Sequence, residues 1–526
     1  MPKWLDAAVF YEIYPQSFYD SNGDGIGDLE GIVRKLDYIK GLGCNALWIN
    51  PCFDSPFKDA GYDVRDYKKI APRYGTNDDA KRLFQAAHEK GIKVLLDLVP
   101  GHTSEEHEWF TESAKSNPAA EYRNRFIWTD HPFKRAENLG FIGGETERPA
   151  TYIVNFFKCQ PALNFGFLKP AEGWQLPMDH PDCVATREAI KDVMRFWLDA
   201  GCDGFRVDMA GSLVKHDDQD KSGTCALWRN IRAMLDADYP EAAIVAEWSC
   251  PKQAIAGGFH ADFLLDFAES AGGYRSILRD YQTDEDNHII SADTSFFKKD
   301  GNHDIRRFLS EYFDHYEKTK DRGFVSLVTC NHDTIRVRYN LEPDELALAY
   351  AFIFTMPGVP FLYYGDEIGM RYLNLPTKEG GYFRTGSRTP MQWDGGANLG
   401  FSTAAADKLY LPVDPAPDAP TVERAENDPT SLLHIVRSLL KLRRENPDLQ
   451  AKANLEVIHG GNGKLPFIYK RGSLVLAVNP GAEEAATSVP FTESKPVDGI
   501  GRAQGACVLK DGVCRMGPQS FSVWRV

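Results

Sequence analysis

The sequence has little that would direct it to a membrane or to a polyanion. No apolar run reaches the roughly 20 residues that a transmembrane helix requires. The N-terminal residues 1–6 begin no long apolar segment of the signal-peptide kind. Basic residues are in deficit, since 60 Lys and Arg stand against 75 Asp and Glu, a formal net charge of −15. We therefore expect neither nucleic acid nor an anionic bilayer as a partner.

Several chemical signatures are absent as well. The chain contains no G-x-S-x-G elbow, P-loop or H-E-x-x-H motif and no internal repeat, which counts against serine-hydrolase, P-loop and zincin chemistry. Its ten cysteines lack the paired spacing of metal sites, and several, such as Cys44, Cys202 and Cys330, lie in or beside apolar runs. We interpret them as buried free thiols of a protein in a reducing cytoplasm.

What the sequence does contain is an alternation of strand-like and helix-like segments. The strand-like segments are largely apolar, as strands buried on both faces are. Eight can be counted, at 8–14, 45–49, 93–98, 204–207, 243–246, 263–266, 325–330 and 360–364. Eight strands interleaved with helices predict an α/β fold, a (β/α)8 TIM barrel.

Two stretches depart from this alternation. Residues 103–176 are rich in aromatics, Pro and Gly without a clean period, and a stretch of this length is usually functional. After residue 447, short apolar runs are split by Gly, Pro and Asn, which indicates a small all-β module. We therefore predict a barrel from residues 1–102 and 177–447, a subdomain at 103–176 inserted after strand 3, and a C-terminal β-sandwich domain at 448–526.

Three strand-like segments end next to a carboxylate: Asp208, Glu247 and Asp333. The C-terminal ends of barrel strands face the mouth in which barrel enzymes carry their active sites. Two or three acids that converge there are what cleavage of a glycosidic bond requires. Each acid taken alone has an ordinary explanation, such as a structural ion pair or a turn, so the prediction depends on their coincidence.

The neighbours of these acids suggest different roles. Arg206 lies two residues before Asp208 and on the same side of the strand, where a guanidinium lowers the pKa of a carboxyl and favours a nucleophile. Glu247 lies in an apolar, aromatic setting that raises the pKa of an acid and suits it to proton donation. Asp333 is suited to binding sugar hydroxyls or to stabilising positive charge.

Four segments resemble the signature regions of the α-amylase family of glycoside hydrolases. They are 97–102, 204–208, 247–248 and 331–333, their order is right, and the resemblance covers essentially the whole chain. It implies an oligosaccharide substrate, with Asp208 as nucleophile, Glu247 as acid/base and Asp333 as transition-state stabiliser. It also implies that His102, Arg206 and His332 contact the sugar and that Asp97 supports them.

Segments 59–63, 160–164 and 388–394 look like the oligo-1,6-glucosidase and α-glucosidase branch, and also like trehalose synthases. The resemblance implies that Asp59 and Arg388 hold the far hydroxyls of a terminal glucose and close the cleft into a pocket, and that Tyr62 offers a stacking surface. A surface ion pair is the plainer reading of Asp59 and Arg388. We expect a retaining α-glucosidase that removes terminal glucose from the non-reducing end of malto- or isomalto-oligosaccharides through a covalent intermediate.

Alternatives stay open. A sugar acceptor in place of water would give a transglycosylase or a trehalose-forming isomerase, and an open cleft would give an endo-acting α-amylase. A non-catalytic transporter subunit is disfavoured, because the acids are in place and no membrane helix is. Departures from the family pattern at Gly101, Ala162 and Met209 put linkage preference and one calcium site in doubt. Either a monomer or a dimer is compatible with the sequence.

A separate motif follows the first strand-like segment. Residues 20–28 place oxygen-bearing groups at every second position, with glycines for a tight turn, a pattern that suits Ca²⁺ or Mg²⁺. Gly31 stands where an EF-hand has Glu, so the loop is of another kind. The family carries a similar calcium loop, and a metal-free turn is the alternative. The predicted ligands are Asp20, Asn22, Asp24, Asp28 and the carbonyl of Ile26.

Overall fold

The computed structural model describes residues 1–136, 138–265, 272–501 and 507–526. Eight parallel strands line up in the order β11-β10-β9-β8-β5-β2-β1-β12. Their bounds are β1 (Phe10–Ile13), β2 (Ala46–Ile49), β5 (Lys93–Leu98), β8 (Gly204–Val207), β9 (Ala243–Ala246), β10 (Ala261–Phe263), β11 (Phe324–Ser326) and β12 (Phe361–Tyr363). A parallel bridge between Val328 and Phe361 joins the two outermost strands. The predicted (β/α)8 barrel is confirmed.

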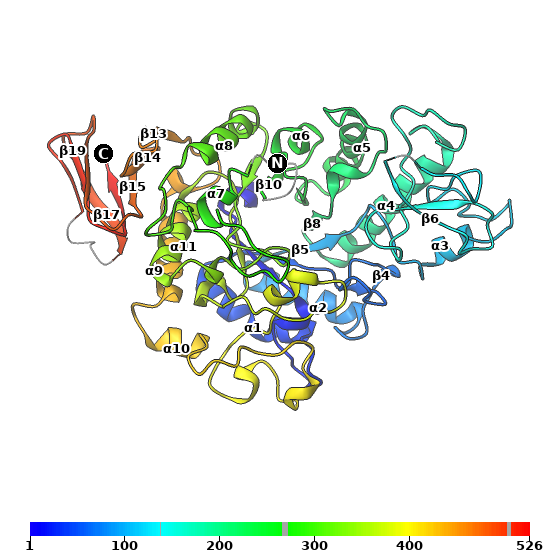
Figure 1. Cartoon of the computed structure of the whole chain (residues 1–526), viewed down its shortest axis with the longest axis horizontal. Coiled ribbons are helices and arrows are strands. Elements are labelled where there is room, and N and C mark those ends of the chain that lie inside the picture. Colours follow the sequence, from blue (N-terminus) through cyan, green and yellow to red (C-terminus); the bar gives the residue numbers. More distant parts are fainter. Residues whose placement is uncertain (137, 266–271, 502–506) are drawn as a thin grey trace.

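Helices cover the outside of this barrel (Figure 1). The α-helices are α1 (Leu29–Leu42), α2 (Asn77–Glu89), α4 (Pro181–Ala200), α5 (Ser222–Asp238), α6 (Pro251–Ala256), α7 (Arg275–Leu278), α8 (Arg306–Thr319), α9 (Pro343–Thr355), α10 (Val422–Asn427) and α11 (Leu432–Glu445). Local chemistry sets their ends. Thr76 and Asp79 form a capping box at the start of α2, and Gly201, with φ 113°, ends α4 in the left-handed conformation that glycine favours.

Two strands differ from their predicted positions. The sixth was expected at 263–266 and runs over Ala261–Phe263, whereas Asp266 lies outside the described residues. The seventh was expected to reach Cys330 but ends at Ser326. Beyond it the chain pairs with β12 instead, through hydrogen bonds between Phe361 and residues 327 and 329. The apolar run therefore predicted strand β11 but not the residue at which its pairing changes from β10 to β12.

Aromatic side chains fill the barrel. The rings of Phe10 and Phe361 stack with centroids 4.3 Å apart, and Phe263 meets Phe361 edge-on at 4.8 Å. Trp48 stacks on Phe263 at 5.5 Å, and none of the four has measurable solvent exposure. These four rings form an aromatic floor inside the barrel. The strand ends, and the acids that follow them, pack on this floor.

The segment after β5 forms a small unit with its own core. It contains α3 (Glu108–Ser113) and the antiparallel pair β6 (Gly140–Gly143) and β7 (Thr151–Val154). A second antiparallel pair, β3 (Phe53–Asp54) and β4 (Asp66–Ile70), follows β2. The core of the inserted unit consists of Ile127, Ala136, Ile153, Ala162, Phe167 and Trp174. The subdomain predicted after strand 3 is confirmed; its boundaries stay a prediction.

The C-terminal region is entirely antiparallel β. One sheet has the order β13-β14-β15-β20-β17 and the other β16-β19-β18. The strands are β13 (Glu456–His459), β14 (Phe467–Arg471), β15 (Leu474–Asn479), β16 (Ala485–Ser488), β17 (Lys495–Gly501), β18 (Val508–Lys510), β19 (Val513–Met516) and β20 (Ser520–Arg525). Val475 and Trp524 from one sheet share a core with Cys514 and Met516 from the other. This region and the inserted unit lie at opposite ends of the molecule (Figure 1).

Two of the predicted absences bear on this fold. None of the helices in the described part of the chain combines the length and apolar character that crossing a bilayer requires. Eight of the ten cysteines are buried free thiols, including Cys44, Cys202 and Cys330. For these eight the interpretation as buried free thiols is confirmed.

The aromatic floor gives a test of the barrel. Phe361→Ala removes the ring that both Phe10 and Phe263 contact, and we expect a loss of about 3–5 kcal/mol in the free energy of unfolding because a buried cavity remains. Thermal denaturation measures the change. Phe133→Ala is the matched control, since that side chain is 87% exposed. Equal effects of the two substitutions would contradict this account of the core.

Candidate active site

A cavity of about 910 Å³ opens at the C-terminal end of the barrel strands. The structure brings the three predicted acids to its wall: Asp208 directly after β8, Glu247 directly after β9, and Asp333 in the segment beyond β11. Three of the predicted substrate-binding residues line it as well, namely Asp59, Tyr62 and His102. Carboxylates that follow three different strands thus share one cavity, as expected of a barrel enzyme.

Arg206 joins the acids on one side of this cavity. Its Nη1 lies 2.8 Å from Asp97 Oδ1 and 3.3 Å from Asp208 Oδ1, and its Nη2 lies 2.6 Å from Glu247 Oε1. The guanidinium is fully buried. Burial lowers its pKa, but Asp97, Glu247, Tyr62 and Asp208 raise it well above the ordinary value, so Arg206 stays charged. One fixed cation thereby holds two cavity acids next to each other.

The protonation of these acids differs from the sequence-based expectation. Burial, followed by the negative charge of Glu247, raises the pKa of Asp208 well above its usual range, although Arg206 acts in the opposite direction. Burial likewise raises the pKa of Asp97 to about 6. Arg206 therefore does not leave Asp208 with a depressed pKa in the free protein. The group of acids instead retains a proton at pH values where isolated carboxyls would all be ionised.

Asp333 is in the opposite electrostatic situation. Its Oδ1 accepts from Arg388 Nη2 at 2.9 Å and from Arg384 Nη1 at 3.1 Å, and its Oδ2 lies 3.2 Å from His332 Nε2. Burial raises the pKa of this carboxyl, but His332 and the two guanidinium groups outweigh burial and lower it. Asp333 is therefore a permanent anion at the cavity wall.

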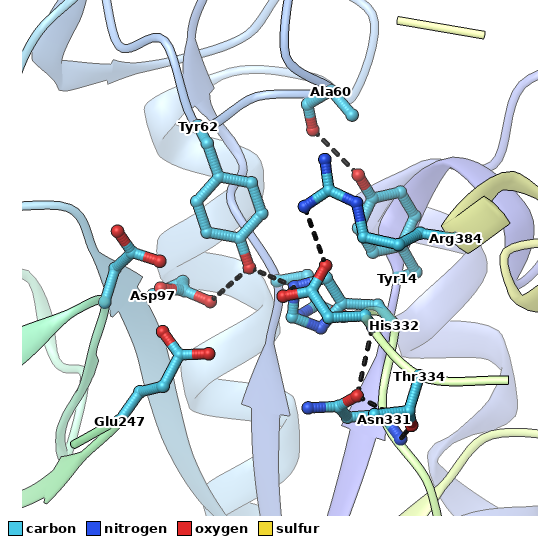
Figure 2. A network of polar contacts seen from close by, with 12 residues as sticks. Tyr14, Ala60, Tyr62, Asp97, Glu247, Asn331, His332, Thr334 and Arg384 are labelled. Atoms are coloured by element: carbon cyan, nitrogen blue, oxygen red, sulfur yellow. Dashed lines mark hydrogen bonds and ion pairs between the residues drawn. The ribbon is translucent and has the colours of Figure 1, made fainter. Parts of the chain in front are cut away.

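The imidazole of His332 is fixed by Glu12 in β1, Asn50 directly after β2, and Tyr62 between β3 and β4. Its Nδ1 lies 2.8 Å from Glu12 Oε1 and 3.0 Å from Asn50 Nδ2. Its ring stacks on Tyr62 with centroids 5.4 Å apart, and the Tyr62 hydroxyl lies between Asp97 and His332 (Figure 2). Sequence reasoning missed Glu12 and Asn50. Their only signal was their place at the ends of the first two strands.

Arg384 also went unpredicted, and it takes the place expected of Arg388. Arg384 lines the cavity, and its Nη2 lies 3.5 Å from Asp59 Oδ1 while its Nη1 donates to Asp333 Oδ1. Arg388 is only 2% exposed and donates to the carbonyl of His332 as well as to Asp333. Arg388 thus supports the wall, and Arg384 forms it.

The predicted substrate-binding residues therefore fall into two layers. Asp59, Tyr62 and His102 line the cavity. Asp97, Arg206, His332 and Arg388 are at most 2% exposed and lie behind these residues and the acids. Arg206 and His332 contact carboxylates, Arg206 those of Asp97, Asp208 and Glu247, and His332 those of Glu12 and Asp333. Their first effect is to set the position and charge of the acids.

The rim adds residues that the sequence did not single out. Phe156 and Phe157 come from the inserted unit, and Tyr382 and Phe383 from a 3-10 turn at Tyr382–Ser387. Three of these side chains are strongly exposed, with Phe156 at 53% and Tyr382 at 56%. Exposed aromatic faces around a polar cavity provide stacking surfaces for sugar rings.

Met209 lies beside both acids at the cavity wall. It has a left-handed backbone conformation, with φ 42°, and its N–H donates to Glu247 Oε2 at 3.1 Å. A non-glycine residue in this region is uncommon and marks a locally constrained backbone. The turn that follows Asp208 therefore also holds Glu247.

The predicted cation loop shows carboxylates occupied by backbone groups. Asp20 accepts from the N–H groups of Gly23 and Gly25, both at 2.7 Å, and from Ser402 Oγ at 2.5 Å. Asp28 caps α1 through the N–H of Gly31. Among the described residues, no group of three or more His, Cys, Asp or Glu side chains is arranged to hold a metal ion. In this arrangement backbone and hydroxyl donors occupy the carboxylates of the loop, and we assign the loop no part in the chemistry.

Comparison with known proteins agrees with this geometry. The chain matches the alpha amylase, catalytic domain family over residues 12–452.

The chain belongs to the alpha-amylase family.

It is 34% identical over 500 residues to the trehalose synthase/amylase TreS of Mycolicibacterium smegmatis, covering 88% of this chain and 79% of that protein. It is also 34% identical over 519 residues to an oligo-1,6-glucosidase of Heyndrickxia coagulans, covering 84% and 85%. The solved trehalulose synthase MutB of Pseudomonas mesoacidophila superposes over the full length of both chains with a TM-score of 0.82 at 24% identity, which supports the fold. The protein is an alpha-amylase-family enzyme that acts on glycosidic bonds.

Asp59 gives a pH-dependent test of the site. Burial raises its pKa to about 6, against an ordinary value of 3.8, although Arg384 and Gln160 act in the opposite direction. The folded protein therefore resists ionisation of Asp59. Its free energy of unfolding falls as the pH rises from 3.8 to about 6, and below 3.8 Asp59 has no such effect. We expect Asp59→Asn to raise the melting temperature at about pH 7 but not at about pH 4, with a gain of at most about 3 kcal/mol.

Thermal denaturation at the two pH values measures this difference. Asp321→Asn, at an exposed position, is the control for a lost negative charge. A stabilisation that persists unchanged at low pH would contradict the role of Asp59 ionisation.

Proposed function

We propose that the protein is a retaining α-glucosidase that releases terminal glucose from the non-reducing end of short α-glucans. The observation that carries the proposal is that two cavity acids, Asp208 and Glu247, share one buried guanidinium. Acids bound to neighbouring nitrogens of one guanidinium lie near enough to act on one glycosidic bond, and the proposal requires a spacing of about 5–5.5 Å between them, as in retaining enzymes.

In this mechanism Asp208 attacks the anomeric carbon while Glu247 transfers a proton to the leaving glycosidic oxygen. The bond to that oxygen breaks as the bond to Asp208 forms, and the shortened glucan leaves. Glu247, now ionised, takes a proton from water, whose oxygen displaces Asp208 from the anomeric carbon with retained configuration. Asp333, a permanent anion, stabilises the positive charge that develops on the sugar ring in both steps.

The position of Arg384 favours a terminal glucose over an internal one. Arg384 spans from Asp59 to Asp333 and forms a wall beside the acids. Carboxylate and guanidinium groups there can bind the hydroxyls that only a chain end presents. This argues against the endo-acting alternative, because a polymer would have to pass through the Asp59–Arg384 pair.

A second candidate is a glucosyl transferase that forms trehalose. The similarity to trehalose synthase/amylase TreS over 88% of the chain favours it as much as the similarity to oligo-1,6-glucosidase favours hydrolysis. Both functions use the same covalent intermediate and differ in the acceptor. The exposed rim aromatics, such as Phe156 and Tyr382, would hold a sugar acceptor in the second case.

Asp208→Asn tests the shared step. We expect turnover to fall by roughly 10⁴-fold or more, because the amide cannot form the intermediate, while the melting temperature does not fall below that of the wild type. Release of nitrophenol from an α-glucoside measures the rate, and Asp321→Asn serves as the matched control. Wild-type activity in the Asp208 variant would remove the assignment of the nucleophile.

Product profiles decide between the two functions. The wild-type enzyme is incubated with maltose, isomaltose, trehalose, sucrose and maltotriose, and products are followed over time by chromatography. We expect glucose to be the main product from maltose or isomaltose. Early accumulation of trehalose from maltose would instead establish the transferase, and cleavage of insoluble dyed starch would establish endo action.

We retain Ca²⁺ at residues 20–28 as a proposal of structural stabilisation, resting on the alternating oxygen groups of that loop. Binding requires Asp24 and Asp20 to exchange backbone donors for the ion. We expect added Ca²⁺ to raise the melting temperature of the wild type and not that of Asp24→Ala, with Mg²⁺ as a parallel titration. No shift in the wild type would end this proposal.

A further inference from the structure

A chain of hydrogen bonds behind the cavity wall runs from His102 to an ammonium group. His102 Nε2 lies 3.1 Å from the carbonyl oxygen of Tyr62, and His102 Nδ1 lies 3.2 Å from Asn155 Nδ2. Asn155 Oδ1 in turn accepts from Lys215 Nζ at 3.1 Å. Lys215 also donates to the carbonyl of Ser212, at 3.0 Å, in the turn that follows Asp208 and Met209. The chain joins the end of β5, the inserted unit and the turn after β8.

These contacts permit only one direction of donation. An ammonium group donates and never accepts, so Asn155 must present its oxygen to Lys215 and its N–H group to His102. A carbonyl only accepts, so His102 must carry its proton on Nε2, toward Tyr62. The imidazole is then neutral, with an unprotonated Nδ1 that receives the Asn155 donor. Each group fixes the state of the next.

Gly101 is the residue that leaves room for this arrangement. A Cβ atom built on Gly101 would lie 2.8 Å from Asn155 Nδ2, closer than a carbon side chain tolerates. Any other residue at this position would displace the Asn155 amide. This chain has Gly101 where the family usually has Asn. The space next to Gly101 is occupied by the side chain of Asn155 from the inserted unit.

We propose that Asn155 and Lys215 are positioning residues that hold His102 as its neutral Nε2–H tautomer in a fixed orientation at the cavity wall, and that Gly101 admits them. The role of His102 at a sugar rests on the proposed function, whereas the hydrogen-bond chain itself does not. The Nε2–H of His102 thereby holds the backbone carbonyl of Tyr62, whose side chain lines the cavity. The ring centroids of Phe156 and His102 lie 6.0 Å apart in an edge-to-face arrangement.

The protonation states agree with this assignment. Burial first, and the charge of Lys215 second, lower the pKa of His102 to about 4, despite its bond to the Tyr62 carbonyl. Burial lowers the pKa of Lys215 to about 8, so the ammonium form is present at neutral pH. A neutral imidazole and a charged lysine are the two states that the direction of donation requires.

The experiment reads the tautomer of His102 by nitrogen NMR on histidine-labelled protein, with His102→Gln to assign the signal. We expect the neutral Nε2–H form in the wild type. Asn155→Asp is nearly isosteric but replaces the donor by an acceptor, so we expect it to draw a second proton onto Nδ1. Asn155→Leu and Gly101→Ala should each give a mixture of tautomers. Gly173→Ala and Lys169→Met, at open positions of the inserted unit, are the matched controls.

Kinetics supply the second readout. We expect Asn155→Leu and Gly101→Ala each to lower kcat/KM by up to about 100-fold, because the imidazole loses its orientation. The kcat/KM of the double variant should lie within about threefold of that of the less active single variant, because both substitutions remove the same contact. Lys215→Arg should retain more activity than Lys215→Met, since it keeps the charged donor.

An unchanged His102 signal in Asn155→Asp, or additive losses in the double variant, would overturn the inference. Asn155→Asp keeps this test decisive if Asn155→Leu fails to fold. If the wild type hydrolyses or transfers no glucoside, the proposed function fails, whereas the NMR comparison still decides on the hydrogen-bond chain.

Discussion

The constraint on which the site depends is the burial of one guanidinium, Arg206, among three carboxyl groups. Arg206 contacts Asp97, Asp208 and Glu247, so one positive charge faces up to three negative ones. Such a cluster is unfavourable in a buried setting unless a proton stays on it. An enzyme that must donate a proton in one step and recover it in the next needs that property. The electrostatic imbalance is therefore part of the chemistry.

The other side of the cavity solves the opposite problem. Asp333 has two guanidinium partners and remains ionised, so it cannot take the proton that the first cluster holds. Two neighbouring carboxylate environments with different numbers of arginines thus separate proton transfer from charge stabilisation. Arg384 contacts both this anion and Asp59. The same arginine thus belongs to the charged wall at Asp333 and to the part of the cavity at Asp59.

The parts of this arrangement that the sequence predicted are those encoded locally. The position of Asp208 followed from a short apolar strand and a carboxylate next to it, and the same holds for Glu247. Glu12 could not be found this way, because its partner His332 lies 320 positions away in the chain. Arg384 reaches the cavity while Arg388 lies behind its wall, a difference set by the turn at Tyr382–Ser387 that the local sequence does not record. Boundaries such as the end of β11 depend on pairing with β12, which no local pattern records.

The inserted unit has more than a covering role, since it reaches the site through different kinds of contact. It supplies exposed rings at the rim, such as Phe156, and a polar side chain, Asn155, behind the wall. The exposed rings at the rim can change with the acceptor without affecting the acids. Asn155, in contrast, is bound to the barrel through Lys215 and the turn beyond Asp208. The rim can therefore differ without any change in the backbone beyond Asp208. In the proposed mechanism hydrolysis and transfer differ only in the acceptor, so the rim is the part of this chain that can distinguish between them.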